Sequence, residues 1–111
     1  MGRNRKPRIT LNVAAILAVM LADTQRSWYG LELAQQAEIG SATVYSALTR
    51  LERAGWIKGL WESVDPKVAG RPRRRLYLLT GEGARLGAEA LATHRIRLGG
   101  LVVPDLQERP A

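Results

Sequence analysis

The segment from Gly40 to Gly55 constrains the fold of this chain more than any other stretch of its sequence. It reads GSATVYSALTRLERAG, and its apolar residues recur at the spacing of one face of an α-helix. Ser41 is a good N-cap and Gly55 a natural residue just beyond a helix end, so the pattern predicts a helix over 42–54. Gly40 is expected to supply the conformational freedom that a tight turn from a preceding helix requires.

This predicted helix has one apolar and one polar face. The apolar stripe consists of Val44, Ala47, Leu48 and Leu51, and the opposite side carries Thr43, Ser46, Thr49, Arg50 and Arg53. Small hydroxyl side chains allow a helix to approach base edges closely, while arginines reach phosphates. An ordinary amphipathic surface helix has the same pattern, so the helix alone does not decide its role. Tyr45 flanks the stripe and fits a core aromatic as well as a phosphate contact.

A basic β-hairpin is predicted directly after this helix. Residues 56–62 and 73–80 read as strands, and 63–72 between them carry turn signals. The arginine-rich return strand suits a minor groove or its flanking phosphates, and the alternative is a solvated edge that discourages sheet aggregation. A helix followed by a basic hairpin is the order of a winged helix-turn-helix, so the expected fold is mainly α with a small β-hairpin.

The positive charge of the chain is concentrated in two segments. The formal net charge is +7, and residues 1–8 contribute four basic and no acidic side chains. Residues 58–75 contribute six basic and two acidic ones, whereas the remainder is close to neutral. A merely soluble surface usually intersperses its signs, so two concentrated basic segments favour a polyanionic partner, with nucleic acid first.

The remaining segments predict three more helices. The first runs from the capping Thr10 to about Ala22 and is apolar enough to be buried by the core or by a second subunit. The second opens at Ser27 and has 31–37 as its body. The last starts after Thr80 and reaches Leu98, and its loosely spaced apolar residues indicate a partner helix. The expected organisation is a basic disordered arm (1–8), a winged helix-turn-helix (9–80), a dimerisation helix (81–98) and a tail (99–111).

Composition argues against an enzyme or a membrane protein. The chain has no cysteine and His94 as its single histidine, so no thiolate, multi-histidine metal site or cofactor is expected. The apolar run over 11–22 is too short to span a bilayer, and although it follows a basic N-terminus, a cleavable signal would remove a helix that the core needs. A cytoplasmic location is therefore expected.

Three short motifs of the chain, in their order along the sequence, resemble the PadR family of bacterial transcriptional regulators in its short subclass, over roughly residues 9–92. The start of the family's second helix is matched by Tyr29-Gly30-Leu31-Glu32-Leu33. Its recognition helix is matched by Thr43-Val44-Tyr45, Leu48, Arg50-Leu51-Glu52 and Gly55. The end of its wing is matched by Gly70-Arg71-Pro72, Arg73 to Arg75, Tyr77, Leu79-Thr80 and Gly83.

The resemblance implies a homodimer that places two recognition helices on a pseudo-palindromic double-stranded DNA operator, usually as a repressor released by a small-molecule effector. The expected DNA contacts are Ser41, Thr43, Tyr45, Ser46 and Arg50 on the helix, and Arg71, Arg73 and Arg74 on the wing. The expected dimerisation residues are Leu11, Ala14, Leu17, Ala18, Leu21, Leu86, Leu91, Ile96 and Leu98. The alternative is a winged-helix adaptor that binds RNA or another protein.

Overall fold

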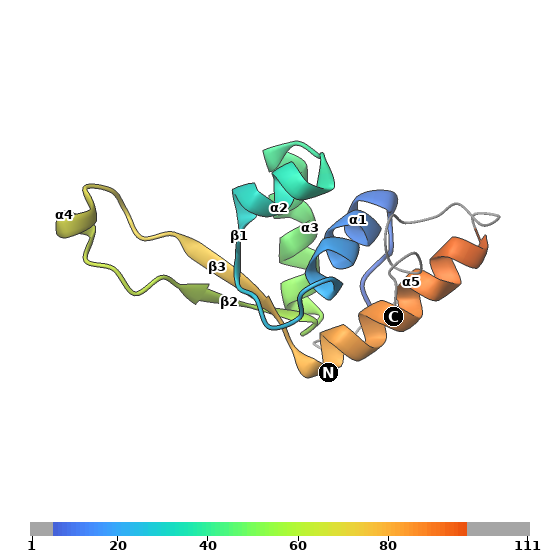
Figure 1. Cartoon of the computed structure of the whole chain (residues 1–111). Coiled ribbons are helices and arrows are strands. Elements are labelled where there is room, and N and C mark those ends of the chain that lie inside the picture. Colours follow the sequence, from blue (N-terminus) through green and yellow to red (C-terminus); the bar gives the residue numbers. More distant parts are fainter. Residues whose placement is uncertain (1–5, 98–111) are drawn as a thin grey trace.

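The computed structural model of the chain describes the backbone of residues 6–97 and the side chains of residues 6–93. The elements in order are α1 (Leu11–Leu21), β1 (Trp28–Tyr29), α2 (Gly30–Ala37), α3 (Ser41–Arg53), β2 (Ile57–Trp61), α4 (Pro66–Ala69), β3 (Arg75–Leu79) and α5 (Gly81–Arg97). Figure 1 shows the longer helices gathered together, while β2 and β3 extend away from them with α4 at the tip. The expected winged helix-turn-helix, mainly α with a small hairpin, is confirmed.

Helix α1 lies at the centre of the hydrophobic core. Thr10 caps it as predicted, because its hydroxyl accepts a hydrogen bond from the Val13 amide at 3.1 Å. α1 packs against α2, α3 and α5, so an almost entirely apolar helix is covered on several sides. Gly87 lies at the close contact with α5, where a Cβ would be 3.3 Å from a methyl group of Leu17.

The start of the second helix differs from the prediction. Ser27 does not open a helix; Trp28 and Tyr29 form a short strand that pairs with Tyr77 and Leu76 of β3, and α2 begins at Gly30. Glu32 holds this junction, because its carboxylate accepts a hydrogen bond from the Tyr29 amide at 2.8 Å. The extra strand makes the predicted hairpin a three-stranded antiparallel sheet of order β1-β3-β2.

The turn between α2 and α3 is built by Glu38 rather than by Gly40. Glu38 has the left-handed backbone conformation (φ 59°), whereas Gly40 has an ordinary φ of −70° and is the N-cap of α3. Ser41 is therefore the first residue of α3 and not its cap. The predicted N-cap was wrong by one residue, and the predicted turn residue was wrong by two. At the other end, Gly55 has φ 81° just beyond the helix, as predicted.

The hairpin formed by β2, α4 and β3 (residues 57–79) is called the wing below. Its strands pair in register, with Trp61 opposite Arg75 and Gly59 opposite Tyr77. The loop contains the helical turn α4, which the sequence did not predict: Asp65 caps it by accepting from the Lys67 amide at 3.0 Å, and Gly70 (φ 73°) ends it.

The wing and α5 are tied to the end of α3 by Thr80 and Gly83. The Thr80 hydroxyl donates to the Gly55 carbonyl at 2.8 Å and accepts from the Gly83 amide at 2.9 Å, so Thr80 caps the last helix, which starts directly after it as predicted. Gly83 lies so close to the turn that a Cβ there would meet the Trp56 carbonyl oxygen at 1.8 Å. Within residues 6–97 no helix has the length and apolar character needed to cross a membrane.

Candidate nucleic-acid interface

The polar face of α3 is exposed as predicted. Val44, Ala47, Leu48 and Leu51 are buried, whereas Ser41, Thr43, Ser46 and Arg50 are exposed. Thr49 is exposed as well, but its hydroxyl donates to the Tyr45 carbonyl within the helix at 2.9 Å. The first two turns of α3 therefore present small hydroxyl groups to the surroundings, and the basic side chains of the helix come only in its last turn.

Tyr45 is partly packed and partly exposed, so its contact with a phosphate stays a prediction. Its side chain is 42% exposed, yet one edge of the ring lies against the start of α2. A Cβ at Gly30 would come within 2.7 Å of the Tyr45 hydroxyl oxygen, so the space for the ring depends on that glycine. The contact aligns α2 with α3 and leaves the remaining ring surface open to a ligand.

The wing is held against α3 by an ion pair that the sequence did not predict. The guanidinium of Arg75 lies 2.8 Å from a carboxylate oxygen of Glu52 on α3. The same guanidinium lies 5.3 Å from the centre of the Trp61 ring, so it also covers part of that indole. Because side chains alternate along a strand, the side of the wing that carries Arg75 and Trp61 is the side that faces α3.

Glu62 is the centre of a second cluster, which lies just beyond the end of β2 on the side of the wing tip. Its side chain is 7% exposed and accepts hydrogen bonds from the Tyr29 hydroxyl at 2.9 Å, the Arg74 amide at 2.9 Å and the Arg71 guanidinium. The Arg71 guanidinium is the main cause that lowers the pKa of Glu62 to about 2. The hydrogen bond to this carboxylate raises the pKa of Tyr29, which keeps the phenol protonated as a donor.

The three arginines predicted to contact DNA from the wing therefore differ in their surroundings. Arg71 is bound to the buried Glu62 carboxylate and so holds the wing together, and its contact with DNA stays a prediction. Arg73 and Arg74 are exposed, and no ion pair involves either of them within the part of the chain that the structure describes. Lys67 on α4 and Lys58 on β2 add exposed basic side chains to the same hairpin.

The residues predicted for dimerisation fall into three groups. Ala14, Leu17 and Leu91 are buried inside the protomer, so their surface is already covered and they belong to its core. Leu11 is 65% exposed, and Ala18, Leu21 and Leu86 are half-buried, so these four leave surface available for a partner. Ile96 and Leu98 lie outside the residues whose side chains the structure describes.

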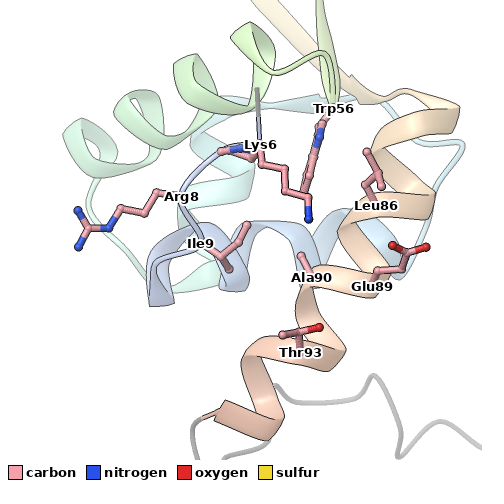
Figure 2. Close-up of a pocket in the computed structure, with 9 residues that line it drawn as sticks. Lys6, Arg8, Ile9, Trp56, Leu86, Glu89, Ala90 and Thr93 are labelled. Carbon is pink, nitrogen blue, oxygen red and sulfur yellow. The ribbon is translucent and has the colours of Figure 1, made fainter. Parts of the chain in front are cut away.

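A cavity of about 560 Å³ lies between the N-terminal segment, α5 and the turn that follows α3. It is lined by Lys6, Pro7, Arg8, Ile9, Trp56, Leu86, Glu89, Ala90 and Thr93. Figure 2 shows the Lys6 side chain reaching into the cavity beside Trp56, while Arg8 points away from it. The walls combine polar and apolar side chains and include two basic groups and one acidic group, and the volume is in the range of small-molecule sites.

Solved structures similar to this chain include several regulators. A PadR family transcription regulator from Clostridium difficile R20291 is 27% identical with a TM-score of 0.58, and the match covers 78% of this chain and 91% of that one. NadR in complex with 4-hydroxyphenylacetate is 29% identical with a TM-score of 0.62 and coverages of 84% and 60%. Staphylococcus aureus MepR, solved with DNA, is 23% identical with a TM-score of 0.61 and coverages of 82% and 68%.

These matches differ in how much of the other protein they include. The chain spans only 60% of NadR and 57% of Lactococcus lactis ZitR, to which it is 22% identical with a TM-score of 0.60 over 83% of its own length. No curated protein sequence is significantly similar to it. The family model that matches covers residues 16–89, from the middle of α1 to α5, and includes the polar face of α3 and the whole wing. The chain therefore belongs to the transcriptional regulator PadR-like family.

Proposed function

We propose that this protein is a sequence-specific DNA-binding transcriptional regulator of the cytoplasm, which represses transcription as a homodimer on a pseudo-palindromic operator. The observation that carries the proposal is the pairing of two exposed surfaces. α3 presents Ser41, Thr43 and Ser46, and the wing beside it presents Arg73 and Arg74. The Glu52–Arg75 ion pair fixes the two surfaces relative to each other.

The chemistry of these surfaces matches the two kinds of contact that DNA offers. A helix in the major groove reads base edges, and the small hydroxyls of α3 allow its backbone to approach them. The exposed arginines of the wing suit phosphates or the minor groove beside that site. Family membership supports the same assignment, and so does the DNA complex of MepR, whose fold is similar.

The surface left free on α1 and α5 supports a homodimer. Leu11 is 65% exposed, and Leu21 and Leu86 are only half-buried, which gives a partner helix apolar surface to cover. A twofold axis through this region would place two copies of α3 on successive half-sites of a duplex. The symmetry of the protein would then appear as the symmetry of the operator.

The cavity between the N-terminal segment and α5 supports release by a small-molecule effector. It combines the apolar side chains of Trp56 and Leu86 with the basic Lys6 and the acidic Glu89, and we expect a small amphipathic anion to bind with its charge at Lys6. NadR, at 29% identity, was solved with 4-hydroxyphenylacetate, which is a practical first probe. We expect such a probe to raise the melting temperature and to weaken DNA binding.

The test of the proposed function is the binding of the purified protein to the DNA upstream of its own gene, beside a scrambled duplex, over a salt series. A preference of about a thousandfold or more for the native sequence, with two protomers per site, is the expected result. Equal and steeply salt-dependent binding to both duplexes would contradict it. An RNA or protein partner for the wing would then be the better hypothesis.

A further inference from the structure

We infer that a hollow on the wing, lined by Trp61, Pro66, Pro72 and Arg73, is a subsite for one sugar–phosphate unit of a DNA strand. This inference rests on the proposed function. It identifies the part of the DNA that would contact the hollow. The hollow is open, with a volume of about 710 Å³, and its lining is mostly apolar. It lies between the end of β2, the start of α4 and the segment that leads into β3.

The exposure of Trp61 is the first observation behind this inference. The side chain is 62% exposed, whereas Trp28 and Trp56, the other two tryptophans of the chain, are 6% and 3% exposed. Trp61 therefore adds little to the core, although it lies in a strand of the sheet. An aromatic ring that a rigid hairpin leaves in solvent is a common mark of a binding surface.

The position of the indole relative to α3 is the second observation. Trp61 pairs with Arg75 in the sheet, and Arg75 is bound to Glu52 of α3, so Trp61 is on the side of the wing that faces α3. A DNA duplex with α3 in its major groove must pass one backbone strand between that groove and the neighbouring minor groove. The surface between α3 and the wing tip is where this strand would run.

The chemistry of the hollow selects a sugar–phosphate unit rather than a base. In a duplex the bases are stacked and paired, so the strand offers apolar C–H faces of deoxyribose and charged phosphate oxygens to its surroundings. The indole and the two proline rings suit the sugar. Arg73 suits the phosphate, because its Nε–H donates to the Val64 carbonyl at 2.8 Å and leaves the terminal NH₂ groups available for oxygens.

Tryptophan emission tests the inference in the unmodified protein. Trp61 is the exposed member of the three tryptophans, so acrylamide, a neutral quencher, should reach it and leave Trp28 and Trp56 largely untouched. Saturation with the upstream duplex is expected to remove most of the acrylamide-accessible emission. Accessible emission that persists at saturating DNA would overturn the subsite while leaving the proposed function standing.

Variants and modified DNA give a second, independent readout. We expect Trp61→Ala to weaken duplex binding on the order of tenfold. Leu60→Ala, a neighbour that is 39% exposed on the other side of the strand, should bind like the unmodified protein. We expect that replacing the phosphates one at a time by neutral methylphosphonate weakens binding of the unmodified protein at one particular position. Arg73→Ala should show no such loss of affinity at that position.

The possible outcomes distinguish failure of the subsite from failure of the proposed function. Equal affinities of the Trp61 and Leu60 variants, together with an unchanged methylphosphonate profile for Arg73→Ala, would overturn the subsite. A protein that binds no duplex at any salt concentration would overturn both the subsite and the proposed function. Protection of Trp61 by a protein rather than by DNA would assign the hollow to that partner instead.

Discussion

The hydroxyl of Tyr29 donates a hydrogen bond to the carboxylate of Glu62 at 2.9 Å, between residues 33 positions apart in the sequence. Tyr29 ends the short strand that precedes α2, and Glu62 follows the last residue of β2. The same carboxylate binds Arg71 and the amide of Arg74 on the returning side of the wing. One buried carboxylate therefore connects the helix-turn-helix with both sides of the wing.

The wing should lose stability in acid because of Glu62. Its folded-state pKa is about 2 against an ordinary value of 4.5, so its contribution to stability is complete above pH 4.5. This contribution is lost as the pH falls through about 2. Amide hydrogen exchange of residues 62–74, followed between these pH values, should show the loss. Glu62→Gln should already exchange faster at neutral pH, and a variant with the same pH profile as the unmodified protein would contradict the assignment.

Substitutions of Arg71 and of Arg73 should have different effects: the first should lower the stability of the fold, and the second should weaken DNA binding. Arg71→Ala leaves the Glu62 carboxylate without its ion-pair partner, so we expect a lower melting temperature. Arg73→Ala removes an exposed cation and one exposed hydrogen bond to Val64, so we expect a melting temperature close to that of the unmodified protein and a salt dependence of DNA binding reduced by roughly one phosphate contact. Thermal unfolding and salt titrations of both variants check this pair. An unchanged salt slope for Arg73→Ala would remove it from the interface.

Thr43 should contribute to base preference without contributing to stability. Its side chain is exposed on α3, so Thr43→Ala should leave the melting temperature unchanged. We expect the ratio of specific to non-specific affinity to fall about fivefold, which corresponds to one lost hydrogen bond or methyl contact. Thr49→Ala is the matched control, because the Thr49 hydroxyl is already bonded within the helix. A loss of stability in Thr43→Ala would mean that the helix face was misassigned.

Gly83 should tolerate no side chain. A Cβ there would lie 1.8 Å from the Trp56 carbonyl oxygen, a backbone atom that cannot swing away, so Gly83→Ala should destabilise the fold by about 3 kcal/mol or more. Gly81→Ala is the control at the start of the same helix, since its Cβ would meet no atom within 4 Å. That substitution should be neutral or slightly stabilising. Denaturant unfolding of both variants measures the difference.

Leu11 should affect assembly rather than folding. It is 65% exposed at the start of α1, so Leu11→Glu changes no core contact but places a charge on the proposed dimer surface. We expect sedimentation to show a monomer at concentrations where the unmodified protein is a dimer, and operator binding to weaken with it. Gln35→Glu adds the same charge on an exposed position of α2 and should change neither property. A dimer that survives Leu11→Glu would move the interface elsewhere.

The parts of the fold that follow from local periodicity were predictable. The buried stripe of α3, the cap at Thr10 and the left-handed Gly55 each depend on neighbouring residues alone. The strand at Trp28 and Tyr29 was missed because two residues have no periodicity, and their extended conformation depends on pairing with distant β3. Glu38 was missed because nothing local marks a glutamate for the left-handed region; the amide of Ile39 reaching back to Ala34 stabilises that turn.

The candidate site was predictable to the same extent. The exposed face of α3 follows from its amphipathic spacing, so Ser41, Thr43 and Ser46 could be named from the sequence. Arg71 and Arg73 could not be told apart, because the difference between them is the presence of Glu62 on another strand. The exposure of Trp61 was likewise hidden, since a tryptophan in an alternating strand ordinarily packs into the core.

The close approach of Gly83 to Trp56 couples the position of α5 to that of the segment just after α3. The helix has 17 residues and is therefore about 25 Å long, and its first turn is fixed on the carbonyl that follows the end of α3. We therefore expect a molecule that shifts the start of α5 to shift the segment just after α3 with it, because the contact between Gly83 and Trp56 leaves no space for the two to move apart independently.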